Sequence, residues 1–205
     1  MISILNYGLG NIASVANMIQ KVGGQSLICN DPAALYDAKK ILLPGVGAFD
    51  HGMEMLHNGG WIEALNVVAL EKQIPILGIC LGMQLMCKSS EEGSLAGLGW
   101  IDAEVIRFNL PEYTECKIPH MGWNPVEVVK LNPLIESNTI QQRFYFVHSY
   151  HVVCNHLDDV IACAHHGYNF TSAFNRSNLF GVQFHPEKSH RFGMAFMKKF
   201  IELPC

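Results

Sequence analysis

The sequence predicts an α/β protein with a mostly parallel central sheet, helices on both faces of that sheet, and a mixed or antiparallel β extension. Two observations carry this prediction. In the first half of the chain, short apolar runs alternate with longer stretches of helical character, as expected for a parallel sheet covered on both faces. In the second half, short β-like segments follow one another with turns between them.

The alternating half begins with a strand at residues 2–6, and a helix at 11–22 follows a glycine-rich turn. After a second strand at 25–29, Asp31-Pro32 resembles a helix start, with an N-cap followed by proline at the first helical position. The remaining elements of this half are a strand at 40–43, a helix at 60–72, a strand at 75–79 and a helix at 81–88. Ligands bind at the C-terminal ends of parallel strands, so the end of the 75–79 strand is a favoured place for a site.

The second half is expected to consist mainly of short strands and to close with a helix. The predicted β segments are 103–108, 126–130, 143–147, 151–154, 160–165 and 171–175, followed by a β-rich run at 178–184 and a helix at 192–203. We see no repeat, low-complexity tract or linker. A chain of 205 residues can bury a sizeable core, so we expect one domain over residues 1–205.

Composition excludes several classes of protein. A net charge of −4 gives no electrostatic footprint for nucleic acid, and no apolar run is long enough to span a membrane. The seven cysteines are odd in number and form no close Cys-x-x-Cys pairs, which argues against a disulfide framework or a zinc site and favours a cytoplasmic location. The run at 6–11 lacks the full Gly-x-Gly-x-x-Gly spacing of a dinucleotide site. We therefore expect neither a metal nor a cofactor.

The most informative position is Cys80, which lies in a Gly-Ile-Cys-Leu-Gly run directly after the apolar strand at 75–79. Gly-x-Cys-x-Gly is the thiol version of the nucleophile elbow, in which a sharp strand-to-helix turn lifts a strained nucleophile out of the sheet. A cysteine there has its sulfur at a helix N-terminus, which favours the thiolate. The alternative interpretation is a buried cysteine beside two packing glycines.

A base and a carboxylate follow the β-rich run at 178–184. Pro186 keeps His185 extended and outside any helix, and residues i and i+2 of an extended backbone share a face, so His185 and Glu187 can point the same way. A histidine oriented by a carboxylate can accept the proton of a thiol, which completes a Cys-His-Glu triad. Alternatively, His185 is a satisfied histidine at a strand end and Glu187 is solvated.

Five runs together resemble a known family. Gly-Ile-Cys-Leu-Gly-Met-Gln at 78–84 and Gln-Phe-His-Pro-Glu at 183–187 resemble the class I, triad-type glutamine amidotransferases. Three further runs, at 6–11, 43–49 and 119–124, resemble those of the glutaminase subunits of imidazole glycerol phosphate synthase, and the similarity covers essentially the whole chain. The resemblance implies a class I amidotransferase fold.

The resemblance also implies roles for residues around the triad. Glycines after a buried strand let backbone N–H groups approach a developing oxyanion, and the residue after the nucleophile supplies a second donor. The implied oxyanion-hole residues are Val46, Gly47 and Leu81, and the implied glutamine contacts are Gly45, Gln84, His148, Ser149 and Tyr150. The implied partner interface consists of Pro119, His120, Met121, Gly122, Trp123 and Asn124.

In function, the resemblance implies a glutaminase that hydrolyses L-glutamine to glutamate and ammonia. It further implies a heterodimer with a (β/α)8-barrel cyclase subunit, which uses the ammonia to make imidazole glycerol phosphate and an aminoimidazole carboxamide ribotide in histidine biosynthesis. One departure from the family is Asn6, where the opening strand usually ends in Asp-Tyr-Gly. It leaves open a paralogue that supplies ammonia to a sugar-amidating synthase for surface polysaccharide. A non-catalytic regulator and a Cys-hydrolase of another amide are alternatives of a different class.

Overall fold

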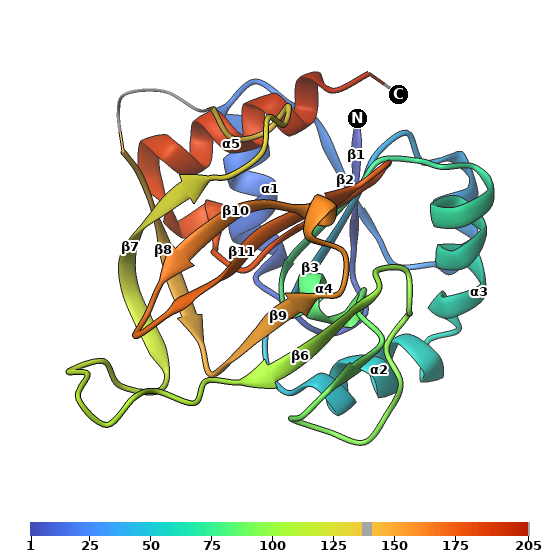
Figure 1. The fold of residues 1–205 in the computed structure, drawn as a ribbon. Coiled ribbons are helices and arrows are strands. Elements are labelled where there is room, and N and C mark those ends of the chain that lie inside the picture. Colours follow the sequence, from blue (N-terminus) through green and yellow to red (C-terminus); the bar gives the residue numbers. More distant parts are fainter. Residues whose placement is uncertain (137–140, 205) are drawn as a thin grey trace.

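The centre of the molecule is a parallel sheet with strand order β2-β1-β3-β4-β12 (Figure 1). The computed structural model describes residues 1–136 and 141–204 of the chain. The parallel strands are β1 (Ile2–Leu5), β2 (Ser26–Cys29), β3 (Ile41–Gly45), β4 (Ile76–Cys80) and β12 (Leu179–Val182). Strand β12, which comes from the end of the chain, therefore lies directly beside β4.

The sheet continues beyond β12 as antiparallel strands. One path adds β11 (Asn169–Arg176), β10 (Val160–His165), β7 (His120–Val128) and β8 (Gln142–His148). A second path leaves β11 through β9 (Tyr150–Cys154) and reaches β6 (Ala103–Arg107) and the short β5 (Ser89–Ser90). These strands form the mixed extension that the second half of the sequence predicts.

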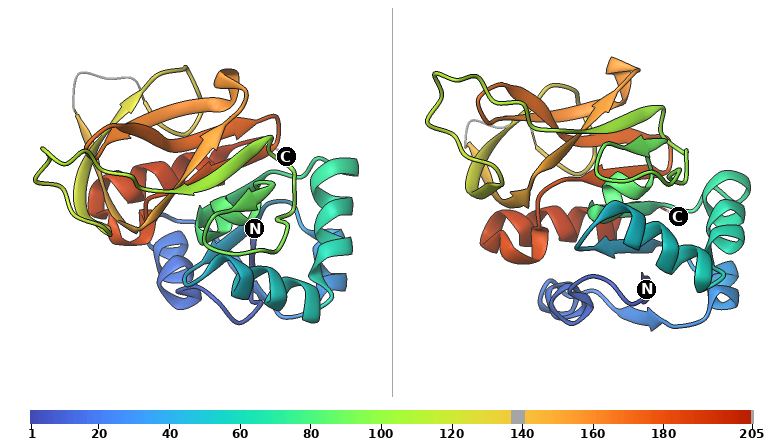
Figure 2. Two further views of the ribbon diagram at one scale, coloured as in Figure 1. Left: turned by 60° about the horizontal axis from the view of Figure 1, so that its bottom comes forward. Right: turned by 90° about the horizontal axis from the view of Figure 1, so that it is seen from below.

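Helices cover both faces of the parallel strands. Helices α1 (Ile12–Lys21) and α5 (His190–Glu202) pack together on one face. The opposite face carries α2 (Phe49–Asn58), α3 (Trp61–Asn66) and α4 (Leu81–Leu85), and the two groups lie on opposite sides of the sheet in Figures 1 and 2. The shorter helical segments are the 3-10 turns η1 (Pro32–Asp37), η3 (Leu157–Asp159) and η4 (Pro186–Lys188), and the π-helical η2 (Val67–Glu71).

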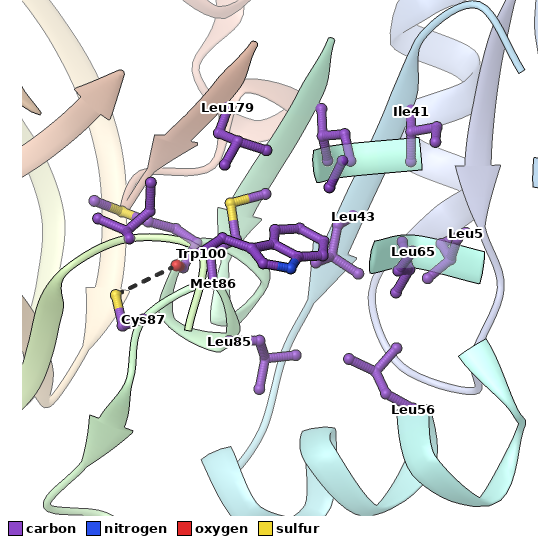
Figure 3. Close-up of a cluster of buried hydrophobic side chains, with 14 of the residues drawn as sticks. Leu5, Ile41, Leu43, Leu56, Leu65, Leu85, Met86, Cys87, Trp100 and Leu179 are labelled. Carbon is purple, nitrogen blue, oxygen red and sulfur yellow. Dashed lines mark hydrogen bonds between the residues drawn. The ribbon is translucent and has the colours of Figure 1, made fainter. Parts of the chain in front are cut away.

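Alternate residues of the central strands enter two different cores. In β3, Ile41 and Leu43 belong to the core beneath α2, α3 and α4, whereas Leu42 belongs to the core beneath α1 and α5. This alternation follows from the two-residue period of a strand and explains why these strands read as continuous apolar runs. Figure 3 shows the first core, in which Trp100 lies among leucine side chains. The indole N–H of Trp100 donates to Asn66 Oδ1 at 2.8 Å.

The predicted fold class is confirmed. The main difference is helix α2, which was not predicted from the sequence. Helix α2 runs through Gly52, a residue that disfavours helix, but its buried residues Phe49, Gly52, Met53 and Leu56 recur at helical spacing. Gly52 is tolerated because it packs closely against leucine side chains of α4. The apolar period was the signal that could have identified this helix.

Four predicted helices have different limits or geometry. The segment after Asp31 is a 3-10 turn, although Asp31 caps it as expected by accepting from Ala33 N at 2.9 Å. The 60–72 helix becomes π-helical after Asn66, where Lys72 N donates to Val67 O at 2.9 Å. Helix α4 ends at Leu85 rather than 88, because the carbonyl of Leu85 bonds instead to Leu98 N. The closing helix begins at 190, two residues earlier than expected.

Strand β7 is longer than predicted. The sequence suggests a strand at 126–130, but backbone pairing with β8 extends from His120 to Val126 and makes one strand of 120–128. Gly122 and Pro125 disfavour strand structure and conceal this pairing in the sequence. The segment 119–124 is therefore mostly part of the sheet rather than a separate loop.

Within the described ranges, no helix combines the length and the apolar character needed to cross a bilayer. The cysteines of those ranges are free thiols, namely Cys29, Cys80, Cys87, Cys116, Cys154 and Cys163.

Candidate active site

Cys80 occupies a strained turn between β4 and α4. Its backbone has φ 53° and ψ −110°, a positive φ that non-glycine residues rarely adopt. The residue pairs with Gly45 at the end of β3, and the preceding Ile79 pairs with Val182 of β12. The nucleophile elbow predicted from the sequence is therefore present, at the C-terminal edge of the sheet and near its middle.

The glycines on either side of the elbow are required by close packing. A Cβ atom on Gly82 would collide with the carbonyl oxygen of Leu43, and one on Gly78 would lie 2.6 Å from the carbonyl oxygen of Gly82. Real Cβ atoms essentially never approach other atoms this closely. The Gly-x-Cys-x-Gly pattern thus lets α4 fold back tightly against β3 and β4.

His185 reaches the same edge from the end of β12. Its backbone N–H donates to Tyr145 O at 2.9 Å, and the buried Ser189 hydroxyl donates to its carbonyl at 2.6 Å. Ser189 Oγ also accepts from Tyr145 N at 3.0 Å. The His185 backbone is consequently fixed between β8 and the start of α5.

The His185 ring is oriented by Glu187. Nδ1 lies 2.8 Å from Glu187 Oε1, and both side chains are only 2% exposed. The contact agrees with the sequence prediction, but its geometric reason differs. His185 is extended, whereas Glu187 belongs to the 3-10 turn η4, so the turn rather than a continuous extended backbone brings the carboxylate to the ring.

The environment of His185 favours its charged form. Burial by itself lowers the pKa of this imidazole, but hydrogen bonding and charge from Cys80 and then Glu187 outweigh that effect and raise the pKa to about 9. Nε2, the ring nitrogen that Glu187 leaves free, has no partner among the described residues within the usual distance and angle limits for a hydrogen bond, although the Cys80 thiol lies near enough to raise the pKa. That nitrogen is available to exchange a proton with the thiol.

Cys80 and His185 line one cavity of about 240 Å³, together with most of the residues that the sequence assigns to substrate and oxyanion binding. The predicted residues in its lining are Val46, Gly47, Leu81, Gln84, His148, Ser149 and Tyr150. Gly45 lies next to this cavity through its pairing with Cys80. A larger cavity of about 510 Å³ lies over β7, β8 and β10, where none of the triad is found, so volume alone does not identify the site.

The loop after β3 has the backbone freedom that an oxyanion hole requires. Gly47 has φ 106°, which favours glycine, and Val46 is 42% exposed at the cavity. A Cβ atom on Gly45 would lie 2.7 Å from the Tyr7 hydroxyl and 2.9 Å from Gly82 N. The loop is therefore pressed against the N-terminal turn of α4 on one side and open to the cavity on the other.

Two glutamine side chains connect the cavity wall to the thiol. Gln84 Nε2 donates to Tyr150 O at 3.2 Å and to Gln183 Oε1 at 3.0 Å, and Gln183 Nε2 lies 3.7 Å from Cys80 Sγ. Both side chains are buried. Gln84 therefore faces the site as predicted, although its amide N–H groups are engaged within the protein.

The side chain of His148, which the resemblance implies as a glutamine contact, is engaged within the protein. Its Nδ1 lies 2.7 Å from Tyr150 O and its Nε2 lies 3.0 Å from His120 Nδ1, so both ring nitrogens have partners inside the protein. At the cavity, the His-Ser-Tyr run can offer its backbone and the neighbouring side chains of Ser149 and Tyr150.

The segment implied as a partner interface has an exposed and a buried part. Met121 is 63% and Trp123 40% exposed, and the Trp123 ring stacks on His190 with centroids 5.3 Å apart. Pro119 is exposed and Gly122 and Asn124 are partly exposed, but His120 is only 5% exposed. His120 therefore points into the protein rather than towards a partner, because strand β7 turns alternate side chains to opposite faces.

The structure adds residues that the sequence analysis did not select. Glu92 and Lys188 line the cavity with a carboxylate and an ammonium group, and Glu92 Oε2 also accepts from Phe49 N at 2.9 Å. Gln183 reaches the thiol from the residue directly after β12. In the sequence, Gln183 belongs to the run at 183–187 and Lys188 follows that run directly, whereas no spacing pattern distinguishes Glu92. Among the described residues, no group of three or more His, Cys, Asp or Glu side chains could hold a metal ion.

The whole chain is similar to known proteins of one kind. Residues 4–203 match the family model for glutamine amidotransferase class-I. Subunit HisH 2 of imidazole glycerol phosphate synthase from Methanococcus maripaludis is 48% identical over 98% of this chain and 99% of its own length, and the Pseudomonas aeruginosa subunit HisH 2 is 45% identical over 99% and 100%. HisH from Leptospira interrogans is 43% identical over 99% of this chain and 100% of its own length.

Solved structures show the same fold at lower sequence identity. PurLQS from Thermotoga maritima superposes with a TM-score of 0.73 at 16% identity, covering 97% of this chain and 94% of the other. The names of the sequence relatives do not favour the alternative of a sugar-amidating paralogue. The chain belongs to the class-I glutamine amidotransferase family and, within it, to the HisH subunits of imidazole glycerol phosphate synthase.

Proposed function

We propose that this chain hydrolyses glutamine to glutamate and ammonia with Cys80 as nucleophile, His185 as base and acid, and Glu187 as the group that orients His185. The observation that supports this most strongly is the strained backbone of Cys80 in a cavity shared with a histidine already paired to a buried carboxylate. A merely structural cysteine has no need of such strain.

The reaction proceeds through a thioester. His185 takes the thiol proton, and the Cys80 sulfur forms a bond to the side-chain amide carbon of glutamine. Backbone N–H groups of the loop containing Val46 and Gly47, and of Leu81, stabilise the oxyanion. His185 then gives its proton to the amide nitrogen, the C–N bond breaks and ammonia leaves. Water attacks the thioester with His185 as base, the C–S bond breaks, and glutamate and the free thiol are released.

The cavity can recognise the α-substituents of glutamine. Glu92 supplies a negative charge for the α-ammonium group, and Lys188 and the backbone of residues 148–150 supply positive charge and donors for the α-carboxylate. Gln84 and Gly45 limit the space around the amide and the thiol. The charges and donors of the cavity lining therefore complement the α-ammonium and α-carboxylate groups of an amino acid.

The ammonia is passed to a partner subunit, since ammonia released into water at neutral pH becomes mostly ammonium. We assign this partner to the (β/α)8-barrel cyclase subunit of the synthase, bound in part through the exposed Met121 and Trp123. The complex would form imidazole glycerol phosphate and an aminoimidazole carboxamide ribotide in the cytoplasm. The chain would act as one amidotransferase domain over residues 1–205.

The direct test is Cys80→Ala, measured as glutamate formed from glutamine by the purified chain with its cyclase subunit. We expect loss of at least about 10³-fold in kcat, because the covalent route is removed. Cys116→Ser changes a thiol outside the cavity and serves as the matched control. Near-normal glutamate release by the Cys80→Ala variant would contradict the mechanism.

The acceptor is tested by adding the cyclase subunit and its ribonucleotide substrate to the wild-type chain. We expect glutamate formation to increase when both are present, as for a glutaminase coupled to its synthase. A glutaminase that ignores them would retain the proposed chemistry but place the ammonia in another pathway.

A further inference from the structure

A chain of hydrogen bonds joins the predicted interface segment to the nucleophile. It passes from Asn124 through His120 and His148 to the carbonyl of Tyr150, and from that carbonyl through the side chains of Gln84 and Gln183 to Cys80 Sγ. We refer to these seven residues as the Asn124–Cys80 chain. Its members come from β7, β8, β9, α4, the residue directly after β12 and the end of β4, and the chain ends at the cavity that Cys80 lines.

The Asn124–Cys80 chain determines which ring nitrogen of His148 and of His120 carries the proton. A carbonyl oxygen only accepts, so the 2.7 Å contact with Tyr150 O requires a proton on His148 Nδ1. A neutral His148 then accepts at Nε2, and His120 must donate from Nδ1 across 3.0 Å. His120 Nε2 is left as an acceptor, and Asn124 Nδ2, which is 3.0 Å away, donates to it. Every donor thus faces an acceptor only when both rings are neutral and protonated at Nδ1.

Asn124 is itself held in place by a second contact. Its Nδ2 also donates to His165 O at 2.7 Å, which joins β7 to the end of β10. An amide nitrogen cannot accept, so donation runs in one direction from Asn124 to the Tyr150 carbonyl, which also accepts from Gln84 on its other side. The register supports this geometry, since His120 pairs with His148 and Asn124 with Phe144 across β7 and β8.

Aromatic rings enclose the two imidazoles and keep them neutral. Phe108, Phe146 and Phe170 contact both rings, with centroid distances between 4.8 and 6.3 Å. Burial, followed by the charge of His166, lowers the pKa of His120 to about 4, and burial lowers the pKa of His148 as well. Water that could replace a lost hydrogen bond is kept away by the same rings.

We propose that His120 is a positioning residue, which through His148 fixes the turn at residues 148–150 where glutamine is held and couples that turn to the interface segment 119–124. This inference rests on the proposed glutaminase function. Removal of the His120 N–H leaves His148 Nε2 without its donor in an apolar enclosure, and the ring and the Tyr150 carbonyl are then free to move. The reacting atoms of the triad do not contact His120, so glutamine binding should suffer more than the intrinsic reactivity of the thiol.

The tautomers provide a test that does not depend on activity. Nitrogen-detected NMR of the histidine side chains at neutral pH should show His120 and His148 neutral and protonated at Nδ1, with Nε2 unprotonated. Resonances that place the proton of either ring on Nε2 would contradict the chain as described.

The functional test compares His120→Phe, His120→Asn and His151→Phe in the complex with the cyclase subunit at saturating concentration. We expect His120→Phe to raise KM for glutamine about tenfold with a smaller change in kcat. His120→Asn, which keeps a donor near the Nδ1 position, should recover most of the loss. His151 is equally buried and packs on the same Phe108, but it bonds to Tyr168 outside the chain, so His151→Phe should leave KM within about twofold.

Alkylation of Cys80 separates failure of this inference from failure of the proposed function. A glutamine-analogue electrophile should label the isolated His120→Phe chain about tenfold more slowly than wild type, whereas iodoacetamide, which needs no α-substituent contacts, should label both equally. Equal labelling of His120→Phe and His151→Phe by the analogue would overturn the positioning role. Absence of glutaminase activity in the wild-type complex would instead overturn the proposed function.

Discussion

At the scale of single residues, the site depends on groups held in states that they would not adopt alone. Cys80 keeps a positive φ because β4, β3 and α4 determine the turn around it. His185 keeps a raised pKa because hydrogen bonding and charge from Cys80 and then from Glu187 outweigh the effect of burial. Both departures occur at one cavity, which is where strained and perturbed groups indicate chemistry.

Glu187→Gln should reduce glutaminase activity roughly 10²-fold or more, because His185 loses the partner that orients it and favours its charged form. The variant should also change the stability profile with pH. In the wild-type protein the folded pKa of about 9 exceeds the unfolded value of about 6.5, so the stabilisation is complete below pH 6.5 and disappears as pH rises through 9.

Chemical denaturation between pH 6 and 10 measures this profile, and the Glu187→Gln profile should be flatter. Glu54→Gln is the matched control, since Glu54 forms an exposed pair with His51 at 3.9 Å. A profile of Glu187→Gln that retains the wild-type slope would exclude the ion pair as its source.

At the scale of elements, short connections place the functional groups more than the long helices do. The turn η4 brings Glu187 to His185, and Ser189 joins that turn to β8 and to α5, where Gly193 N donates to Ser189 O at 3.0 Å. The β4–α4 turn does the same for Cys80. Each of these elements is only a few residues long, so its geometry is set by packing rather than by helix propensity.

Ser189→Ala should lower the free energy of unfolding by about 1–3 kcal/mol, because Tyr145 N and the His185 carbonyl lose their buried partner. It should also lower kcat, since the His185 backbone is released. Ser89→Ala removes an exposed hydroxyl and should change neither quantity appreciably. Urea denaturation with parallel kinetics provides the comparison, and unchanged stability of Ser189→Ala would show that the hydroxyl does not brace the turn.

At the scale of the whole molecule, the sheet joins a parallel half that carries the nucleophile to an antiparallel half that carries the buried histidines. Strand β12 is the junction, parallel to β4 on one side and antiparallel to β11 on the other. The histidines His120, His148 and His151 lie in the antiparallel half, and burial lowers the pKa of each. Because these histidines are neutral in the folded protein, the free energy of unfolding depends on pH.

The free energy of unfolding should therefore fall as pH decreases from 6.5 towards 5. A histidine with a lowered folded pKa binds its proton first in the unfolded chain, so its stabilisation is present above pH 6.5 and is lost below it. For His120, with a folded pKa of about 4, the loss rises through this window towards about 1.4 kcal/mol per pH unit near pH 5. His120→Asn should reduce the slope by about that amount, whereas the exposed His57→Gln should retain it. An unchanged slope in His120→Asn would show that His120 is not buried in its neutral form.

The sequence by itself determined the parts of this protein that depend on local pattern. The alternation of apolar runs predicts the parallel sheet, the Gly-x-Cys-x-Gly run predicts the elbow, and Pro186 predicts an extended His185, because each depends on backbone sterics within a few residues. Helix α2 was within reach of the same reasoning, since its apolar period is visible despite Gly52.

Only the tertiary structure decided which distant groups meet. The pairing of β12 with β4 brings His185 to Cys80, and the pairing of β7 with β8 turns His120 inwards to His148. A hydrogen bond from Phe49 N, at the start of α2, holds Glu92 at the cavity. These contacts depend on strand order and register, and a shift of one residue would reverse every side chain of a strand. Local sequence pattern carries no information about the register between distant strands. The proximity of the triad residues and the Asn124–Cys80 chain therefore depend on the folded sheet.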